Sequence, residues 1–495
     1  MKLRTSFERA LGWGTVSFLL VAIVGVAGSI LVARLYGIAV IGAFALALAP
    51  CGLMSVVSSM REQVALVGEL AAPPAGSPRV RALFTAVLAL STVISVVVGS
   101  VVLALAWALL SGPIGRPDLV APAAVLLAGH VVVTNVGANL DALLTAFRVS
   151  RGLCLVRVVQ EASYVALAIG GVFAGGTVWA LVVAMVVSRA VGVALRLPLA
   201  VPLLGRRPTF ADLREGVSEL PALIRFGIRV TPGAIADGVA VSAGTWLVGL
   251  IAPVAAVGAY SRAWGLAFRF RELCARIGEV LFPVLAEHRA KDRSKAFDVD
   301  LLRTIRWALA GMLLPAAVGA GAADGIMRIF GAGFEAGADA LAFALLVPPI
   351  AAVSESLGHA LNALGRPLVP TKIAIGRTVA AVGGGYILVG QIGIAGAPLA
   401  LALAYLGGLL PLAWALRGHI AVPVHEWLPA RLRVTLAAAA TAGFFAARAT
   451  EQLLVGASGT AAALAIGALA YLSVVATAEL FARRQPVPSR LGAVR

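Results

Sequence analysis

Apolar runs of about 20 residues recur along the whole chain, and they restrict its fold more than any other feature. A helix of about 20 apolar residues can cross the roughly 30 Å hydrocarbon core of a membrane. Only 13% of the residues are charged, against about 25% in a soluble domain. The strands of a membrane barrel would instead alternate apolar and polar residues in short segments. The sequence therefore predicts an all-α polytopic membrane protein.

These runs predict about fourteen transmembrane helices. The expected spans are 11–33, 38–66, 82–110, 119–146, 153–174, 177–204, 226–250, 254–284, 303–326, 337–364, 368–390, 393–416, 431–450 and 455–481. The first run follows Lys2, Arg4 and Arg9 and is too long for the apolar region of a signal peptide. We therefore interpret it as the first membrane helix.

Basic residues are distributed unevenly between the two sides that these spans define. An even number of spans places both termini on one side. That side carries the basic N-terminus, Arg206, the "EHRAKDRSK" segment around Lys291 and the basic C-terminal tail. The opposite side carries few basic residues. Cytoplasmic segments of membrane proteins are enriched in Lys and Arg, so we expect both termini in the cytoplasm. The same enrichment accounts for the net charge of +17, and we expect no nucleic-acid partner.

Several functional classes lack their sequence signals. The longest polar segments, 205–225 and 285–302, are short, and no GxxxxGK[ST] phosphate-binding loop occurs. The three cysteines are scattered without a CxxC spacing, and the five histidines form no metal-binding pattern. The glycine-rich stretches "GAGFEAG" and "GGGY" follow no strand, and small residues let membrane helices approach closely. We expect no metal, no cofactor and no enzymatic activity.

An internal repeat divides most of the chain into two halves. "VARLYGIAVIGAFALA" from Val32 resembles "VGLIAPVAAVGAYSRA" from Val248, and Gly42 aligns with Gly258. "LDALLTAFR" is similar to "GHALNALGR", and "FAGGTVWALVVAM" to "GIAGAPLALALAY". The offset stays near 216–221 residues, so each half has about six helices in the same orientation. Membrane carriers commonly have such repeats, with the substrate site between them.

The repeat predicts four regions. Residues 1–204 form a first six-helix lobe, 205–225 a cytoplasmic linker, and 226–417 a second six-helix lobe. Residues 418–495 supply two further helices and a basic cytoplasmic tail.

The eighth span carries arginines that a membrane helix should avoid. In "YSRAWGLAFRFRELCARIGEVLFP" (260–283), Arg262, Arg269 and Arg276 recur every seven residues and share one helix face. With entry at the outer surface near residue 254, Arg262 lies about 12 Å deep and Arg269 about 22 Å deep. A charge at mid-helix costs about 2.5–3.5 kcal/mol and usually faces a bundle interior or a watery cavity. Arg276 would reach the inner interface, where a long side chain extends to water.

Two interpretations of this ladder stay open. Glu272 and Glu279 stand three and four residues from the arginines, so the stripe could be a set of paired and neutralised charges. Alternatively, the arginines bind an anionic substrate. Other charged residues also fall at membrane depth. Two pairs of them, Arg157 with Glu161 and Glu355 with His359, have a spacing that suits an ion pair within one helix. The charges are Arg34, Arg61, Glu62, Arg157, Glu161, Asp237, Glu355, His359 and Arg377.

At this point the chain resembles the multidrug/oligosaccharidyl-lipid/polysaccharide (MOP) exporter superfamily, and within it the polysaccharide flippases, the Wzx-like proteins. The stretches that carry the resemblance are "ILVARLYGIAVIGAFALA" (30–47), "VAAVGAYSRAWGLAFRF" (254–270), "LFPVLAEH" (281–288), "RIFGAGFEAGADAL" (328–341), "ALNALGRP" (360–367) and "GIAGAPLALALAYL" (393–406). Their order and spacing cover most of the chain.

The resemblance implies movement of an undecaprenyl-pyrophosphate-linked oligosaccharide from the inner to the outer leaflet of a bacterial cytoplasmic membrane. It also implies alternating access of two lobes around a cationic cavity. We expect Arg262 and Arg269, with Arg34 and Arg61 from the first lobe, to contact the anionic headgroup, because Arg binds phosphate through a planar fork of donors. Asp237 and Glu355 are candidates for coupling to an ion gradient. The expected partners are the lipid-linked anionic glycan, membrane lipids and polysaccharide polymerase or assembly proteins.

Three alternatives remain at the level of the sequence. A lipid II flippase shares the fold and the charge pattern. A drug exporter of the MATE type shares the fold, but cationic drugs favour an acidic cavity. A membrane glycosyltransferase or polymerase would be expected to carry acidic or His residues on a sizeable outer loop, which the spans leave no room for.

Overall fold

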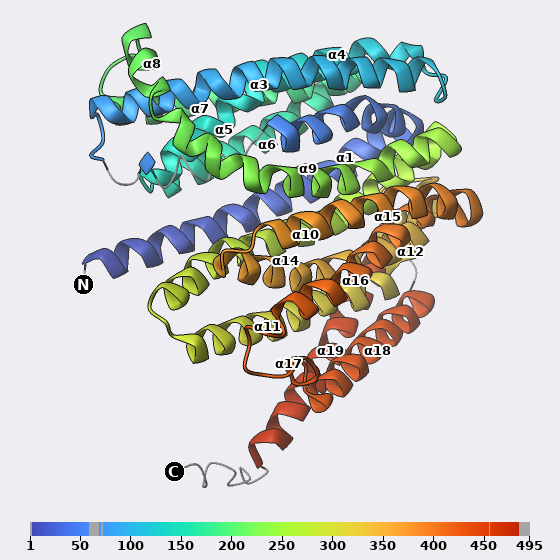
Figure 1. The fold of residues 1–495 in the computed structure, drawn as a ribbon. Coiled ribbons are helices and arrows are strands. Elements are labelled where there is room, and N and C mark those ends of the chain that lie inside the picture. The colour runs from blue at the N-terminus through green and yellow to red at the C-terminus, as the bar shows by residue number, and fades with distance from the viewer. Residues whose placement is uncertain (1, 59–68, 71–72, 455, 485–495) are drawn as a thin grey trace, which may run out of the picture.

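The computed structural model describes residues 2–58, 69–70, 73–454 and 456–484, and these residues form a bundle of helices without a strand (Figure 1). The helices are α1 (Lys2–Ser58), α3 (Pro78–Ser111), α4 (Val120–Gly129), α5 (Asn135–Ala146), α6 (Ser150–Phe173), α7 (Val178–Leu204), α8 (Phe210–Val217), α9 (Leu220–Ile251), α10 (Val254–Ala290), α11 (Ser294–Gly321), α12 (Ala323–Ile329), α13 (Ala338–Ala344), α14 (Val347–Ala363), α15 (Leu368–Ile392), α16 (Gly396–Leu416), α17 (Val424–Trp427), α18 (Ala430–Leu453) and α19 (Ala457–Arg484). The all-α fold predicted from the apolar runs is confirmed.

Ten stretches of the described residues are long and apolar enough to cross a membrane. Two of them, Leu20–Met54 and Leu368–Leu416, each contain a change of backbone direction, at Gly37 and Gly393. Gly37 has φ +74° and ψ 167°, a conformation that is open almost only to glycine. There α1 folds back on itself, so that one helix label covers two expected spans (Figure 1). Helices α10 and α18 are not among the ten stretches, and the number fourteen stays a prediction.

The two ends of the chain lie at the same end of the bundle. Helix α1 begins and α19 ends on the left in Figure 1, and α8 lies at that end too. This arrangement agrees with an even number of crossings. We call this end the predicted cytoplasmic end, and the end where α10 begins the predicted outer end.

Glycines bring the two repeat-related halves into direct backbone contact. A methyl group on Gly42 would lie 1.9 Å from the carbonyl oxygen of Val254, and one on Gly258 would lie 2.2 Å from the carbonyl oxygen of Ile38. Val254 lies four residues before Gly258, and Ile38 lies four residues before Gly42. The contact is therefore reciprocal, as at a two-fold axis. Gly42 and Gly258 are the two residues that the sequence repeat aligns, and they meet where α1 crosses α10 near the predicted outer end.

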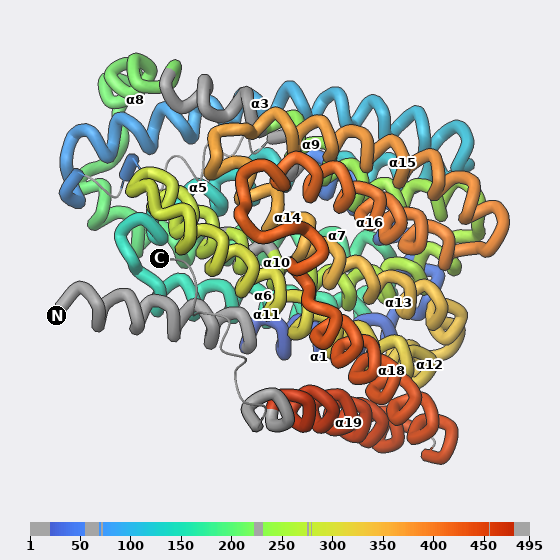
Figure 2. The backbone as a smooth tube through the Cα atoms, turned by 60° about the horizontal axis from the view of Figure 1, so that its bottom comes forward, coloured from blue at the N-terminus to red at the C-terminus, as the bar shows by residue number. Residues whose placement is uncertain are grey.

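The last two helices pack together and against the second half of the chain. Figures 1 and 2 show α18 and α19 side by side at one edge of the bundle. A methyl group on Gly443 of α18 would lie 3.2 Å from the carbonyl oxygen of Gly467 in α19. The hydroxyl of Tyr471 donates a hydrogen bond to the carbonyl of Ala310 in α11, at 2.8 Å. These helices thus attach to α11.

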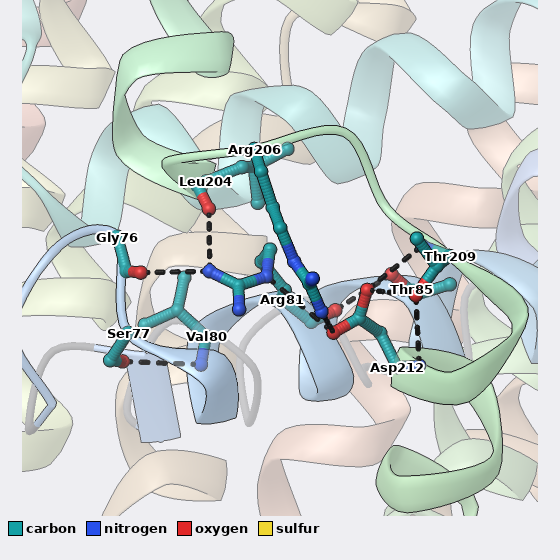
Figure 3. A network of polar contacts seen from close by, with 9 residues as sticks. All are labelled: Gly76, Ser77, Val80, Arg81, Thr85, Leu204, Arg206, Thr209 and Asp212. Atoms are coloured by element: carbon teal, nitrogen blue, oxygen red, sulfur yellow. Dashed lines mark hydrogen bonds and ion pairs between the residues drawn. The ribbon is translucent and has the colours of Figure 1, made fainter.

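The segment expected to link the lobes is ordered as a short helix docked on α3. Thr209 and Asp212 form a capping box at the start of α8, and Asp212 accepts a hydrogen bond from Arg206 at 3.3 Å (Figure 3). The Nε atom of Arg81 in α3 lies 3.5 Å from the same carboxylate. Arg81 also donates to the carbonyls of Gly76 and Leu204, at 2.8 and 3.2 Å. The predicted linker therefore belongs structurally to the first lobe as far as α8, and α9 begins at Leu220, six residues before the expected span.

Substitution of Gly258 should separate the helices at this crossing. In Gly258→Val the side chain has no space beside the carbonyl of Ile38, and overpacking of this kind costs about 1–3 kcal/mol. We expect a lower thermal midpoint of the purified protein in detergent. Gly265→Val is the matched control, because a methyl group on Gly265 of the same helix meets no described atom within 4 Å. Equal midpoints for the two variants would contradict the crossing.

The docking of α8 should depend on the ionised Asp212 carboxylate. Hydrogen bonds from Thr209, and then from Arg206, lower the pKa of Asp212 from 3.8 to about 2. Because the pKa is lower in the docked state, the docking is fully stabilised above about pH 4 and weakens as the pH falls towards 2. A fluorescent label at Phe210→Cys should report release of α8 in this window.

The matched pair for this measurement is Asp212→Asn and Glu215→Gln. Glu215 is exposed on the same helix, whereas Asp212 is 2% exposed. At neutral pH we expect faster amide hydrogen exchange across α8 in Asp212→Asn and unchanged exchange in Glu215→Gln. Unchanged exchange in both would remove the carboxylate from the docking.

Candidate functional site

Helix α10 presents the first arginine of its ladder to α1. The Nη1 atom of Arg262 donates a hydrogen bond to the Oγ atom of Ser29, at 2.7 Å. The Nε atom of Arg262 is buried and makes no hydrogen bond to any part of the chain that the structure describes. A buried donor without a partner costs about 1–3 kcal/mol. Arg262 therefore retains binding capacity at the surface where the two lobes meet.

The second arginine of the ladder and a carboxylate from the other lobe both lie over Gly25 of α1. A methyl group built on Gly25 would lie 3.1 Å from Oε1 of Glu161 in α6 and 3.3 Å from Nη2 of Arg269. Both side-chain ends therefore lie over the same point of α1. Arg269 also pairs with Glu272 at 3.3 Å, but these two side chains are 38% and 42% exposed, and such exposed pairs contribute about 0–1 kcal/mol.

Two further residues join this group, and sequence reasoning did not select them as site residues. Arg189 of α7 is exposed, and it interacts electrostatically with Glu161, Arg196, Cys51 and, least strongly, Arg269. Tyr164 of α6 interacts electrostatically with Arg262, Glu161 and Arg189. We call Arg189, Arg262 and Arg269, with Glu161 and Tyr164, the interlobe basic cluster. Its members come from α6 and α7 on one side and α10 on the other, with α1 between them.

The pairing of Arg157 explains why Glu161 is available to this cluster. The sequence spacing suggested that Arg157 and Glu161 pair within one helix. In the structure, Nη2 of Arg157 instead bonds to Asp141 of α5 at 3.1 Å. Arg196 of α7 binds the same carboxylate and also donates to Gln160 at 2.9 Å. Asp141 thus serves two arginines inside the first lobe.

The other predicted headgroup residues lie elsewhere. Arg34 is exposed at the predicted outer end, where its Nε atom donates to the carbonyl of Ile329 at the end of α12, at 2.7 Å. It also borders a cavity of about 200 Å³ together with Arg328, Glu451 and Thr460. Arg61 lies outside the described residues, as do the side chains of Arg276 and Glu279. The structure thus groups Arg262 with Arg269 and places Arg34 beside α12.

The two acids expected to couple to an ion gradient belong to one buried network in the second lobe. Asp237 of α9 forms an ion pair with Arg377 of α15. The guanidinium of Arg377 lies 3.9 Å from the ring centroid of Tyr405 in α16, and Arg271 of α10 donates to the Tyr405 hydroxyl at 3.1 Å. Arg271 in turn pairs with Glu355 of α14 at 3.3 Å.

This network changes the requirements for ion coupling. Each candidate acid already binds an arginine, and Arg377 is only 6% exposed at its side chain. A coupling cation would have to displace a guanidinium that is fixed to the chain. Ion coupling at Asp237 and Glu355 therefore stays a prediction, and it requires that the cation displace the bound guanidinium. Within the described residues, no three His, Cys, Asp or Glu side chains form a group that could hold a metal.

Comparison with known structures identifies the class of fold. A structure of the lipid II flippase MurJ in an inward closed conformation matches with a TM-score of 0.72 and 13% identity, over 95% of this chain and 99% of that one. An inward-facing multidrug resistance MATE family transporter of the MOP superfamily matches with a TM-score of 0.59 and 18% identity, over 81% and 94%. A MOP superfamily transporter from Pyrococcus furiosus matches with a TM-score of 0.51 and 17% identity, over 82% and 93%. The fold is that of a MOP superfamily transporter.

Sequence comparison identifies the family. Residues 31–330 match the model of the family described as polysaccharide biosynthesis protein. No curated protein matches the chain significantly. Because the family match covers more than half of the chain, the chain belongs to the polysaccharide biosynthesis protein family. The predicted polysaccharide family and the predicted fold of the MOP superfamily are confirmed, and the chain is a multi-pass membrane protein.

The ion pair between Asp237 and Arg377 should be a determinant of stability. Removing one partner of a buried pair costs about 3–5 kcal/mol, because the other charge stays buried and unpaired. We expect Arg377→Leu to lower the yield and the thermal midpoint of the purified protein strongly. The double variant Asp237→Asn/Arg377→Gln should recover most of the loss. A double variant less stable than either single variant would contradict the pairing.

Proposed function

We propose that this protein is a flippase. It moves an undecaprenyl-pyrophosphate-linked oligosaccharide from the inner to the outer leaflet of the bacterial cytoplasmic membrane, for cell-surface polysaccharide biosynthesis. Membership of the polysaccharide biosynthesis family and the transporter fold support a role in transport rather than catalysis. The observation that carries the substrate assignment is Arg262, whose Nη1 atom bonds to Ser29 of α1 and whose buried Nε atom bonds to no described group.

The chemistry of the headgroup explains the need for such a site. A diphosphate and its sugars are too polar to enter hydrocarbon without compensating contacts. Arg supplies a fixed fork of N–H donors that matches phosphate oxygens, and charge-assisted hydrogen bonds are about twice as strong as neutral ones. Arg262 and Arg269 lie on one helix face at the lobe interface, where they can hold the diphosphate while the lipid tail stays in the membrane.

The described contacts between the lobes fit alternating access. The glycine crossing, the bond from Arg34 to Ile329 and the bond from Arg262 to Ser29 all join the halves in the outer part of the bundle. In the proposed cycle these contacts break when the site opens outward. Arg34 then becomes free to contact the leaving headgroup, and Arg61 is proposed to contact it at the cytoplasmic side.

Coupling and assembly partners complete the proposal. Protonation or cation binding at Asp237 or Glu355 would free Arg377 or Arg271 and loosen the second lobe, which gives a route from an ion gradient to the cycle. Both termini are proposed to lie in the cytoplasm. A polysaccharide polymerase or assembly protein at the outer surface would receive the flipped glycan.

One second candidate has an observation in its favour. The match to the lipid II flippase covers nearly the full length of both chains, so lipid II is an alternative cargo. Both cargos present a lipid-linked diphosphate, so the interlobe basic cluster serves either one. The glycan decides between them. For a cationic drug the cluster has the wrong sign, because its three arginines outnumber the two nearby carboxylates, Glu161 and Glu272.

The test is the sidedness of the lipid-linked glycan in cells that lack the protein and in cells that carry Arg262→Ala. We expect the glycan to accumulate in the inner leaflet in both. Loss of a hydrogen bond to a charged group costs about 1.5–3 kcal/mol, which corresponds to roughly a 10–100-fold slower rate. Arg289→Ala is the matched control, because Arg289 is exposed near the end of the same helix.

Each outcome has a separate meaning. Accumulation in the null strain alone would keep the flippase and remove Arg262 from its path. If lipid II rather than a polysaccharide precursor accumulates, the second candidate is correct. Normal sidedness of both lipids in the null strain would end the proposal.

A further inference from the structure

We infer that the predicted outer end of the protein holds a binding site for one neutral sugar unit, in the cavity that α12, α18, α19 and Arg34 of α1 enclose. We call it the outer cavity. Arg34, Arg328, Glu451 and Thr460 contact the sugar. The inference goes beyond the proposed function, which concerns the headgroup. It rests on that function only for the source of the sugar, which is the glycan of the cargo.

The outer cavity has the size of a small polar ligand. Its volume is about 200 Å³, below the roughly 300–1,000 Å³ of pockets that hold drug-sized molecules. The space therefore suits one sugar ring and not a chain of sugars. It lies at the end of the bundle where a flipped glycan emerges, so one unit of the glycan can enter it while the rest stays in water.

The first observation is a buried carboxylate with acceptor capacity. Glu451 of α18 lines the outer cavity, and its side chain is only 4% exposed. Its Oε1 atom accepts a hydrogen bond from Arg328 at 3.2 Å. Its Oε2 atom is buried without a hydrogen bond to any described group, and Nη1 of Arg448 lies 3.7 Å from it. A carboxylate can accept about four hydrogen bonds, so Glu451 has capacity for the hydroxyl group of a ligand.

The second observation is a hydroxyl group at the same wall of the outer cavity. A methyl group on Gly325 of α12 would lie 2.4 Å from Oγ1 of Thr460 and 2.8 Å from Oε1 of Glu451. Both oxygen atoms therefore lie over one point of the α12 backbone, where glycine leaves room for them. Thr460 is 3% exposed, and its hydroxyl donates to the carbonyl of Gly456 at 3.3 Å. Its oxygen atom keeps its lone pairs for a donor on the ligand.

Two guanidinium groups supply donors to the outer cavity. Arg34 uses its Nε atom for the carbonyl of Ile329, at 2.7 Å. Arg328 uses Nη2 for Glu451 and Nε for the carbonyl of Asp324, at 3.3 Å. A guanidinium has several further N–H donors in a fixed plane. Because Arg34 and Arg328 are both exposed in part, these donors are open to a ligand.

The mixture of donors and acceptors selects the ligand. A phosphate or a uronate would meet the two arginines, but it would also meet the buried carboxylate of Glu451, and like charges repel strongly where water is excluded. An apolar ligand would leave the polar groups of the wall without partners, which is costly. A sugar hydroxyl both donates and accepts, so it can donate to Glu451 and accept from Arg34 or Arg328. The lining therefore fits a neutral hexose or N-acetylhexosamine.

The outer cavity depends on the contact between the lobes. Arg34 belongs to the first lobe and Arg328 to α12 of the second, and the bond from Arg34 to Ile329 joins them. A ligand shifts a conformational equilibrium only through contacts that differ between the two states. A sugar that touches both arginines therefore stabilises the arrangement in which the outer end is closed. It retains the glycan at the outer surface after the lobes have closed behind it.

The test is a saturation-transfer NMR titration of the purified protein in nanodiscs, with glucose, N-acetylglucosamine and glucuronate at constant ionic strength. Inorganic phosphate is added as a competitor. We expect a neutral sugar to bind more tightly than glucuronate and phosphate not to displace it. Thr460→Val should weaken its binding about fivefold, through loss of a neutral hydrogen bond. Arg328→Met should weaken it about tenfold, through loss of a charge-assisted one.

Matched variants separate a contact with the sugar from a structural effect. Thr450→Val is the control for Thr460→Val, because Thr450 is a buried threonine of α18 that does not line the outer cavity. Arg116→Met is the control for Arg328→Met, because Arg116 pairs with a carboxylate of its own loop. Both controls should bind the sugar as the wild type does. Arg328→Lys covers the case in which Arg328→Met does not fold, and it should bind with intermediate affinity because it keeps the charge but loses the planar fork.

The outcomes distinguish this inference from the proposed function. If neither neutral sugar binds, or if glucuronate or phosphate binds more tightly, the inference is overturned, whereas accumulation of the glycan in the inner leaflet of the null strain would still support the flippase. Equal weakening in Thr460→Val and Thr450→Val would also overturn it. If a neutral sugar binds as expected while the null strain shows normal glycan sidedness, the sugar site stands and the proposed function fails.

Discussion

The contact on which the interlobe site depends is the crossing of α1 and α10 at Gly42 and Gly258. Neither residue has a Cβ atom, so Gly42 can approach the carbonyl of Val254 and Gly258 can approach the carbonyl of Ile38. This approach places α10 against α1 along its outer half, and so brings Arg262 to Ser29 and Arg269 over Gly25. Larger residues at the crossing would hold the helices apart and the arginines away from α1. A packing detail of the repeat thus determines the geometry of the site.

The distribution of acids separates scaffold from site. Inside the lobes, the arginines have carboxylates of their own: Asp141 serves two in the first lobe, and Asp237 and Glu355 serve one each in the second. These contacts neutralise charge that would otherwise be costly at membrane depth. At the lobe interface, Arg189, Arg262 and Arg269 outnumber the nearby carboxylates of Glu161 and Glu272, which is unfavourable for an empty protein. An excess of charge that the fold does not neutralise is expected where an anionic ligand supplies the balance, and not where helices only pack.

The sequence predicted the elements well and their partners poorly, for a physical reason. The eighth span was expected at 254–284, and α10 runs from Val254 to Ala290, because hydropathy and helical period are local properties. The reciprocal glycines were found as a repeat. Pairing of Arg157 with Asp141 rather than with the nearby Glu161 depends on how α5 and α6 face one another, which no local pattern records. Arg189 was missed for the same reason, since a single arginine in an apolar run gives no sign of what it faces.

The covalent path between the lobes restricts how they can move. Helix α8 is fixed to α3 through Asp212. Glu219 follows α8 after one intervening residue, and it pairs with Arg79 of α3 at 3.0 Å. Helix α9 begins at the next residue, Leu220. The connection between lobes is therefore almost without slack at the predicted cytoplasmic end. For the proposed cycle, relative rotation must pivot close to Glu219, while the outer contacts at Gly42 and Gly258 separate. Those contacts are backbone packing at two glycines, so their separation breaks no ion pair.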